Sequence, residues 1–91
     1  MLFIVKTLSA LTQAQALASH SDAVLLVENA VYSAVSQHHA FPQLKDMTVW
    51  VLSEDALARG IESRVSPSVQ KVDFDGFVAL TVQHEQSITL E

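Results

Sequence analysis

Val49–His84 reads VWVLSEDALARGIESRVSPSVQKVDFDGFVALTVQH. An apolar strand, Val49–Leu52, leads into Ser53, whose hydroxyl is suited to cap a helix, and Gly60 is suited to end that helix in a left-handed turn. A second strand, Val69–Val72, leads into a second helix that also begins with acidic residues. Strands that alternate with helices predict parallel βαβ units.

The same alternation extends in both directions along the chain. Further apolar strands are expected at Met1–Val5, Ala23–Val27 and Ser87–Leu90. Helices are expected at Thr12–Ser19, Ala30–Ser36 and Phe74–His84, with an irregular loop at Gln37–Asp46 and a polar link at Glu62–Ser68. We therefore predict one domain over residues 1–91, an α/β fold arranged as a three-layer α/β/α sandwich.

The composition predicts an oligomer. Only 16% of the 91 residues are charged, whereas about 25% is typical, and 49% are apolar. The mean hydropathy is positive, at +0.29. A domain of this size has a thin interior, so part of the apolar surplus is expected on the surface, where large patches mark association sites.

Charge and apolar run length exclude several classes of function. The net charge is -5, and the five basic residues are scattered, so no basic stripe is available to follow a nucleic-acid backbone. The apolar runs are far shorter than the roughly 20 residues that span a membrane. The first residues lack the basic segment of a signal peptide. We predict a cytoplasmic protein that contacts neither nucleic acid nor membrane directly.

The chain contains no cysteine. This excludes disulfides, thiolate metal sites, thiol redox chemistry and a persulfide carried on this chain. The chain also has neither of the glycine-rich phosphate-binding motifs, GxGxxG and GxxxxGKS/T. His20, His38, His39 and His84 do not have metal-ligand spacing, and His84 is interpreted as the cap of the last helix. The sequence predicts no cofactor and no metal site.

Polar side chains follow the expected strands. Right-handed crossovers bring the carboxyl ends of parallel strands to one edge of the sheet, where ligands usually bind. The residues expected at this edge are Lys6, Glu28, Asn29, Ser53, Glu54, Asp55, Asp73 and Asp75. We interpret Glu54 and Asp55 as first-turn helix acids and Asp73 as an N-cap, in preference to a paired-carboxylate catalytic site. No catalytic residue is predicted.

Four residues are expected to contact a partner protein: Val31, Tyr32, Phe74 and Phe77. The reasoning is that apolar side chains on short or terminal helices of an apolar chain reach the surface. Packing in the core is the alternative for each of them. Trp50 alternates with Val49 and Val51 in its strand, which places it either in the core or at a subunit interface.

Three segments resemble the TusB/DsrH family of sulfur-relay proteins. They are AVLLVENAVYSAV (Ala23–Val35), VLSEDALARGI (Val51–Ile61) and VDFDGFVALTVQH (Val72–His84). The resemblance spans essentially the whole chain and implies a DsrE-like (flavodoxin-like) fold with a mainly parallel five-stranded sheet. Departures from the family pattern are Asn29, where an acid is usual, and Phe74, where tyrosine is common.

The resemblance also implies partners. Family members assemble with TusC- and TusD-like (DsrF- and DsrE-like) paralogues as a dimer of heterotrimers. In the Tus branch the complex passes sulfur to a TusE/DsrC-like acceptor, toward 2-thiolation of the tRNA wobble uridine. The persulfide-bearing cysteine belongs to the TusD/DsrE partner. Some DsrH members also carry a cysteine in the first helix, near the position of Ala14 in this chain.

The resulting hypothesis is a non-catalytic subunit of a TusBCD-like complex. One alternative is a DsrH-like subunit in intracellular sulfur oxidation. Another is a free-standing small-molecule binding protein that uses the acidic strand-end edge. Spare apolar surface predicts self-association of the isolated chain, and the terminal Leu90-Glu91 pair is compatible with a cloning scar.

Overall fold

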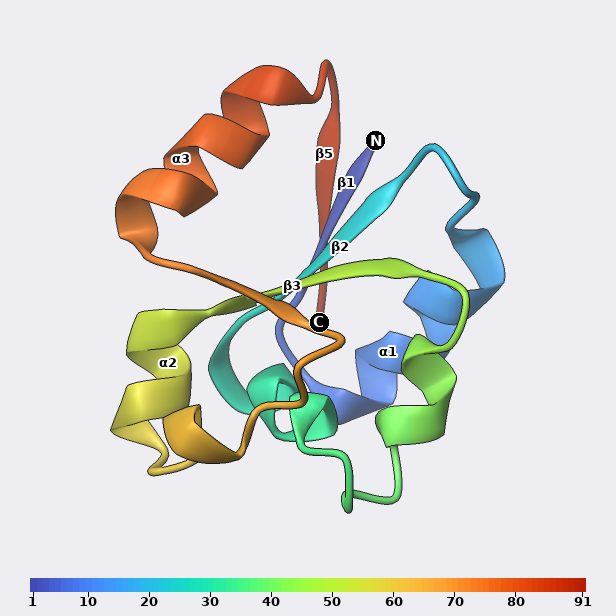
Figure 1. The fold of residues 1–91 in the computed structure, drawn as a ribbon. Coiled ribbons are helices and arrows are strands. Elements are labelled where there is room, and N and C mark those ends of the chain that lie inside the picture. The colour runs from blue at the N-terminus through green and yellow to red at the C-terminus, as the bar shows by residue number, and fades with distance from the viewer.

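The computed structural model describes all residues, 1–91 (Figure 1). Its strands are β1 (Leu2–Val5), β2 (Ala23–Leu26), β3 (Thr48–Leu52), β4 (Gln70–Val72) and β5 (Ser87–Leu90). Its α-helices are α1 (Leu8–Leu17), α2 (Ser53–Ala58) and α3 (Phe74–Gln83). Three 3₁₀ helices complete the chain: η1 (Glu28–Ala34), η2 (Phe41–Leu44) and η3 (Glu62–Arg64).

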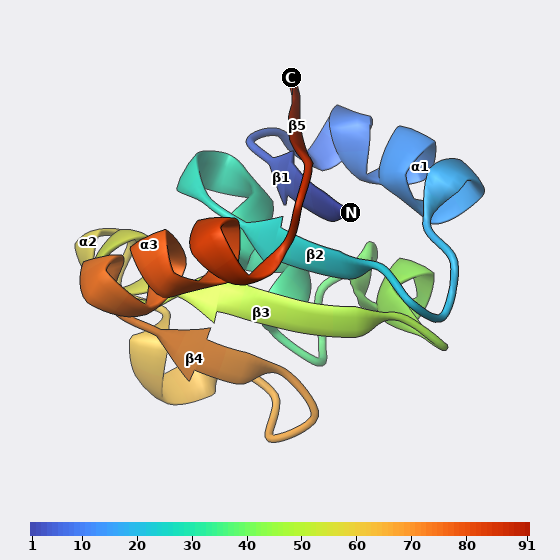
Figure 2. The same ribbon diagram turned by 90° about the horizontal axis from the view of Figure 1, so that it is seen from above.

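The five strands form one sheet in the order β4-β3-β2-β1-β5, and every pair is parallel (Figure 2). This confirms the predicted α/β fold with a parallel five-stranded sheet. Flavodoxin-like sheets have the order 2-1-3-4-5, so the two differ in which strand lies beside β1. Here β1 lies between β2 and β5.

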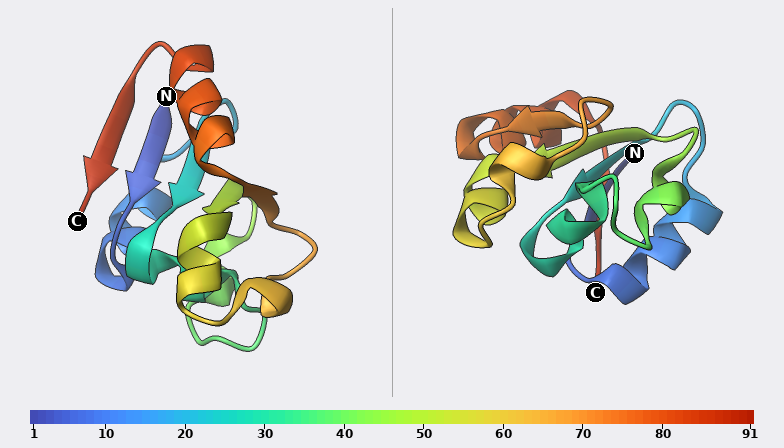
Figure 3. Two further views of the ribbon diagram at one scale, coloured as in Figure 1. Left: turned by 90° about the vertical axis from the view of Figure 1, so that its left-hand side faces the viewer. Right: turned by 60° about the horizontal axis from the view of Figure 1, so that its bottom comes forward.

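The strand order explains where the helices lie. From β1 to β4 the chain steps across the sheet in one direction, so right-handed connections place α1, η1, η2 and α2 on one face. The chain then returns past three strands to β5, and the same handedness places α3 on the opposite face. The right-hand view of Figure 3 shows α1 and α3 on opposite sides of the sheet.

The two faces are covered unequally. A cluster of 19 buried residues fills the space between the sheet and the face that carries α1, η1 and α2. On the α3 face the cluster holds only 6 buried residues, and Leu80 is the single fully buried residue of α3 itself. β2, at the centre of the sheet, is buried along its whole length. One face of the domain is therefore thinly covered.

Two elements of the first half differ from the sequence prediction. α1 begins at Leu8, not Thr12, because the Thr7 hydroxyl accepts a hydrogen bond from the Ala10 N–H at 3.1 Å and caps the helix there. The expected helix at Ala30–Ser36 is the 3₁₀ helix η1. It begins earlier, directly after β2, where Glu28 has a left-handed backbone (φ 49°). Val27, which was expected to end the strand Ala23–Val27, therefore lies in a tight turn between β2 and η1.

Two of the three helix ends predicted in the second half of the chain are confirmed. The prediction for Gly60 is confirmed: its φ is 72°, and the next N–H, of Ile61, bonds the Ala56 carbonyl at 3.0 Å. Asp73 is the N-cap of α3, as predicted. The prediction for Ser53 is wrong, because α2 starts on Ser53 itself and has no side-chain cap.

The two connections expected to be irregular each hold a short helix. η2 lies within Gln37–Asp46, with Pro42 in its first turn, where the missing N–H of proline costs nothing. η3 lies within Glu62–Ser68. η2 and η3 lie on the face of the sheet that holds the larger buried cluster, and both contribute residues to the pockets described below.

Candidate functional site

The residues predicted at the carboxyl edge of the sheet do lie there, and most of them form hydrogen bonds or ion pairs. Asp55 Oδ2 accepts a hydrogen bond from the Glu28 N–H at 2.6 Å, across 27 residues of sequence. Arg59 Nε donates to Asn29 Oδ1 at 3.0 Å, and its guanidinium lies 4.0 Å from Asp55 Oδ1. These contacts bind the start of η1 to α2.

A second pair of acids caps α3. Asp73 Oδ1 accepts from the Gly76 N–H at 2.8 Å, and Glu54 Oε2 accepts from the Phe74 N–H at 3.0 Å. Asp73 is the predicted N-cap, and Glu54 and Asp55 lie in the first turn of α2 as predicted; their carboxylates also accept the N–H groups at the starts of α3 and η1. A carboxylate that accepts a backbone N–H at a helix start satisfies a donor that has no partner within the helix.

Lys6 closes the edge on the side of β1. Its Nζ lies 2.7 Å from Glu91 Oε1 and 3.3 Å from Glu28 Oε2. The hydrogen bonds that Lys6 donates to Glu91 and then to Glu28 raise the pKa of Lys6, and the bond from Lys6 lowers the pKa of Glu91. The connections change faces between β3 and β4, because β3 leads into α2 and β4 leads into α3 on the opposite face. The usual ligand crevice of such sheets lies there, whereas Lys6 follows β1, two strands away from β3. The Lys6 cation is neutralised by two carboxylates.

A shallow groove of about 460 Å³ adjoins this edge on the α3 face. Its apolar lining comes from Ile4, Val27, Leu52 and Phe77. The charged groups that reach it, among them Lys6, are those already paired with each other. The arrangement does not favour the free-standing binding protein considered above.

Three of the seven exposed large apolar side chains lie on α3. Phe74, Val78 and Val82 are 59%, 46% and 80% exposed. Their spacing of four residues puts them on one face of the helix, and we call these three residues the α3 stripe. Phe77 is half-buried against the sheet, and its ring meets that of Phe74 edge to face at 6.0 Å. The predicted exposed apolar surface is present, and α3 carries more of it than any other element.

The other predicted partner-contact residues have different positions. Val31 is wholly buried in the larger core, so the expectation that it lies on the surface is wrong: η1 turns it inward against the sheet. Tyr32 is half-buried at the margin of the same core. Trp50 is half-buried on the α3 face, packed against the smaller cluster.

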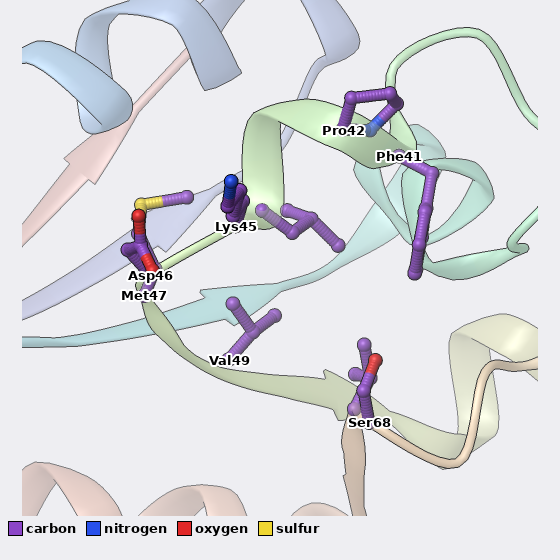
Figure 4. A pocket seen from close by; sticks show the side chains of 9 residues that line it. Phe41, Pro42, Lys45, Asp46, Met47, Val49 and Ser68 are labelled. Carbon is purple, nitrogen blue, oxygen red and sulfur yellow. The ribbon is translucent and has the colours of Figure 1, made fainter.

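The largest groove was not predicted. It measures about 470 Å³ and lies near the start of β3 and β4, at the end of the sheet opposite the carboxyl edge (Figure 4). Phe41, Met47 and Val49 give it an apolar wall, and Lys45 and Asp46 lie at one side. The sequence signal for this groove is the apolar content of Gln37–Asp46, the segment expected to be an irregular loop.

The histidines do not converge on one point. The rings of His38 and His39 stack with centroids 4.3 Å apart, and His38 Nδ1 accepts a hydrogen bond from the Ala40 N–H at 3.1 Å. Partial burial, with a smaller contribution from His39, lowers the pKa of His38. His84 lies at the end of α3. No group of three or more histidine or acidic side chains is placed to hold a metal ion.

Comparison with known proteins agrees with this architecture. The family model described as DsrH like protein matches residues 6–87. The chain belongs to the TusB/DsrH family. Protein TusB of Escherichia coli O81 is 34% identical over 74 residues, which cover 79% of this chain and 78% of that protein. Protein TusB of Salmonella enteritidis is 39% identical over 70 residues, 75% of this chain and 74% of that protein.

Membership of the TusB/DsrH family supports a role in sulfur relay. This TusB/DsrH chain has no cysteine, and Ala14, near the place where some DsrH members have one, is fully buried in α1. No helix reaches the length and apolar character that a membrane crossing requires. The features left unexplained by the fold itself are the α3 stripe and the surface pockets.

Proposed function

We propose that this chain is a non-catalytic, cytoplasmic subunit of a TusBCD-like sulfur-relay complex. The complex passes persulfide sulfur to a TusE-like acceptor, toward 2-thiolation of the tRNA wobble uridine. The observation that carries the proposal is membership of the TusB/DsrH family in a chain without cysteine. Persulfide transfer needs a thiolate at each carrier, so the sulfur must reside on partner chains.

The carboxyl edge supports a structural role for this chain. The carboxylates of Glu54, Asp55 and Asp73 accept backbone N–H groups, and Lys6 is held between two acids. A general acid or base needs a proton that is free to move to a substrate. These groups instead fix η1, α2 and α3 against the end of the sheet.

The α3 stripe is the proposed contact with the TusC- or TusD-like subunits, together with Phe77 beneath it and Tyr32 at a second point. α3 joins the smaller core through one fully buried residue, and Phe74, Val78 and Val82 remain open to solvent. Complete burial of such side chains contributes roughly 1.5–3 kcal/mol each, less what is already buried. A few buried side chains supply most of the free energy of an interface, and we expect Phe74, with the two valines beside it, to be the anchor of this contact.

The stripe can be tested by co-purification. The variant Phe74→Ser/Val78→Ser/Val82→Ser is expected to keep its fold, because all three side chains are exposed, and to lose co-purification with TusC- and TusD-like chains. Leu17→Ser is the matched control, since Leu17 is 54% exposed at the end of α1, on the opposite face of the sheet from the stripe. Equal retention of partners by both variants would overturn the interface.

The pathway needs a separate test in cells. Deletion of the chain is expected to abolish 2-thiolation of the wobble uridine, measured by mass spectrometry of tRNA nucleosides. Re-expression of the wild-type chain should restore the modification, and the stripe variant should not. If deletion impairs sulfur oxidation while tRNA thiolation continues, the proposed pathway is wrong.

A further inference from the structure

A small pocket lies between η1, the segment after it, and η3. It measures about 300 Å³ and is lined by Tyr32, Val35, Gln37, His38, Ile61 and Arg64. We call it the Arg64 pocket. Three of its lining side chains are apolar or aromatic, and the other three carry N–H donors. No carboxylate lines it, although the chain has ten acidic residues.

The two sides of the pocket are tied together. Val35 and Val65 form an isolated antiparallel bridge, and the Ser66 N–H donates to the Ala34 carbonyl at 2.8 Å. These contacts join the end of η1 to the residues that follow η3. Arg64 is itself anchored through its N–H, which donates to the Ile61 carbonyl at 2.8 Å. The pocket is thus formed before any ligand arrives, which reduces the cost of binding.

Arg64 is one of two basic side chains without an acidic partner. Lys6, Arg59 and Lys71 each lie within 4.0 Å of a carboxylate, whereas Lys45 and Arg64 do not. The acid nearest to Arg64 in sequence, Glu62, is bound by Lys71 at 3.3 Å. Lys45 differs from Arg64 in having Asp46 beside it in its groove. The Arg64 guanidinium is therefore the cation left available to an external anion.

His38 supplies a neutral donor. Its Nδ1 accepts the Ala40 N–H at 3.1 Å, which assigns the ring proton to Nε2. Burial and the stacked ring of His39 oppose protonation of this imidazole and lower its pKa. The pocket then has one positive charge, on Arg64, with neutral polar groups from Tyr32, Gln37 and His38 around it.

We infer that the Arg64 pocket binds a carboxylate side chain, a glutamate of a partner protein. A guanidinium matches the two oxygens of a carboxylate in a bidentate pair, and the aliphatic stem of glutamate fits the apolar wall of Val35 and Ile61. A nucleic-acid backbone is a worse fit, because a chain of charge -5 with one open cation here would repel the flanking phosphates. That the glutamate belongs to a partner subunit rests on the proposed function; carboxylate binding by the pocket does not.

The isolated chain tests the pocket without any partner. We would titrate ¹⁵N-labelled protein with N-acetylglutamate amide, with the uncharged N-acetylglutamine amide as the control ligand. Saturable shifts are expected at the amides of Gln37, His38 and Arg64. Arg64→Gln is expected to weaken binding at least ~10-fold, as loss of a charge-assisted bond does, whereas Lys45→Gln leaves it unchanged. Arg64→Lys keeps the positive charge but loses the bidentate geometry of the guanidinium, so its affinity should lie between those of wild type and Arg64→Gln.

Several outcomes would overturn the inference. They are equal shifts with the glutamine ligand, shifts that persist in Arg64→Gln, and tighter binding of a single-stranded oligonucleotide than of the carboxylate. Retained dispersion of the ¹⁵N spectrum shows that each variant is folded. In the assembled complex, Arg64→Glu should weaken co-purification. If the carboxylate binds the isolated chain but the complex ignores Arg64→Glu, the pocket stands and its assignment to a subunit contact fails.

Discussion

Removal of the cap of α3 is expected to loosen the helix that bears the exposed stripe. Asp73 accepts from the Gly76 N–H at 2.8 Å, and replacing an N-cap aspartate by alanine costs about 1 kcal/mol. In a domain of this size that loss lowers Tm by roughly 4–8 °C. Asp73→Asn keeps an acceptor oxygen at the same place, so it should retain most of the stability.

Glu54 provides a second test of the cap of α3, because it lies on α2 and accepts a hydrogen bond from the first turn of α3. Its carboxylate accepts from the Phe74 N–H at 3.0 Å and is exposed, so Glu54→Ala is expected to cost about 0.5–1 kcal/mol. Asp75 lies in the same first turn without a side-chain hydrogen bond. Asp75→Asn loses only the interaction with the helix dipole, and a cost of a few tenths of a kcal/mol is expected.

Urea unfolding followed by Trp50 fluorescence is the appropriate assay. Trp50 is the single tryptophan and packs against the cluster that holds α3 to the sheet. The expected order of stability is wild type, Asp75→Asn, Glu54→Ala, Asp73→Ala, with an unchanged m value. If Asp73→Ala and Asp73→Asn are equally unstable, the charge matters more than the hydrogen bond. If Glu54→Ala matches wild type, the contact between α2 and α3 contributes nothing.

Three further predictions concern the rest of the fold. Gly60→Ala should cost about 1–2 kcal/mol in urea unfolding, since φ is 72° there and no atom lies within 4 Å of the added Cβ; a neutral result would mean that the turn relaxes. Leu25→Ala, in the fully buried central strand, should cost about 2–5 kcal/mol and lower the urea midpoint accordingly, and a loss below 1 kcal/mol would contradict the packing. Hydrogen bonds from the N-terminal ammonium group and Ser19 lower the pKa of Asp22 from 3.8 to about 2. The Asp22 carboxylate therefore stabilises the fold above pH 3.8, and this contribution is lost as the pH falls toward about 2. Tm measured across that range should therefore fall more steeply for wild type than for Asp22→Asn, and parallel curves would contradict the linkage.

The sequence predicted the parts of the structure that depend on neighbouring residues. Gly60 ends its helix and Asp73 caps the next, because each acts on backbone groups two to four residues away. The alternation of apolar strands with helices was enough to predict a parallel sheet. The prediction failed at Ser53, where β3 passes into α2 without a capping residue, and at Val31, which η1 turns into the core.

The amino-acid sequence by itself determined the fold class, the family and the absence of a thiol. Only the tertiary structure decided which helix each acid caps: Asp55 reaches Glu28 and Glu54 reaches Phe74, 27 and 20 residues apart. It likewise placed Arg64 beside His38 without a carboxylate, and left Phe74, Val78 and Val82 uncovered. Local signals fix helix ends through hydrogen bonds within one turn. The pairing of side chains at the carboxyl edge depends on which strands are neighbours in the sheet, and the pattern of a single sequence does not specify that order.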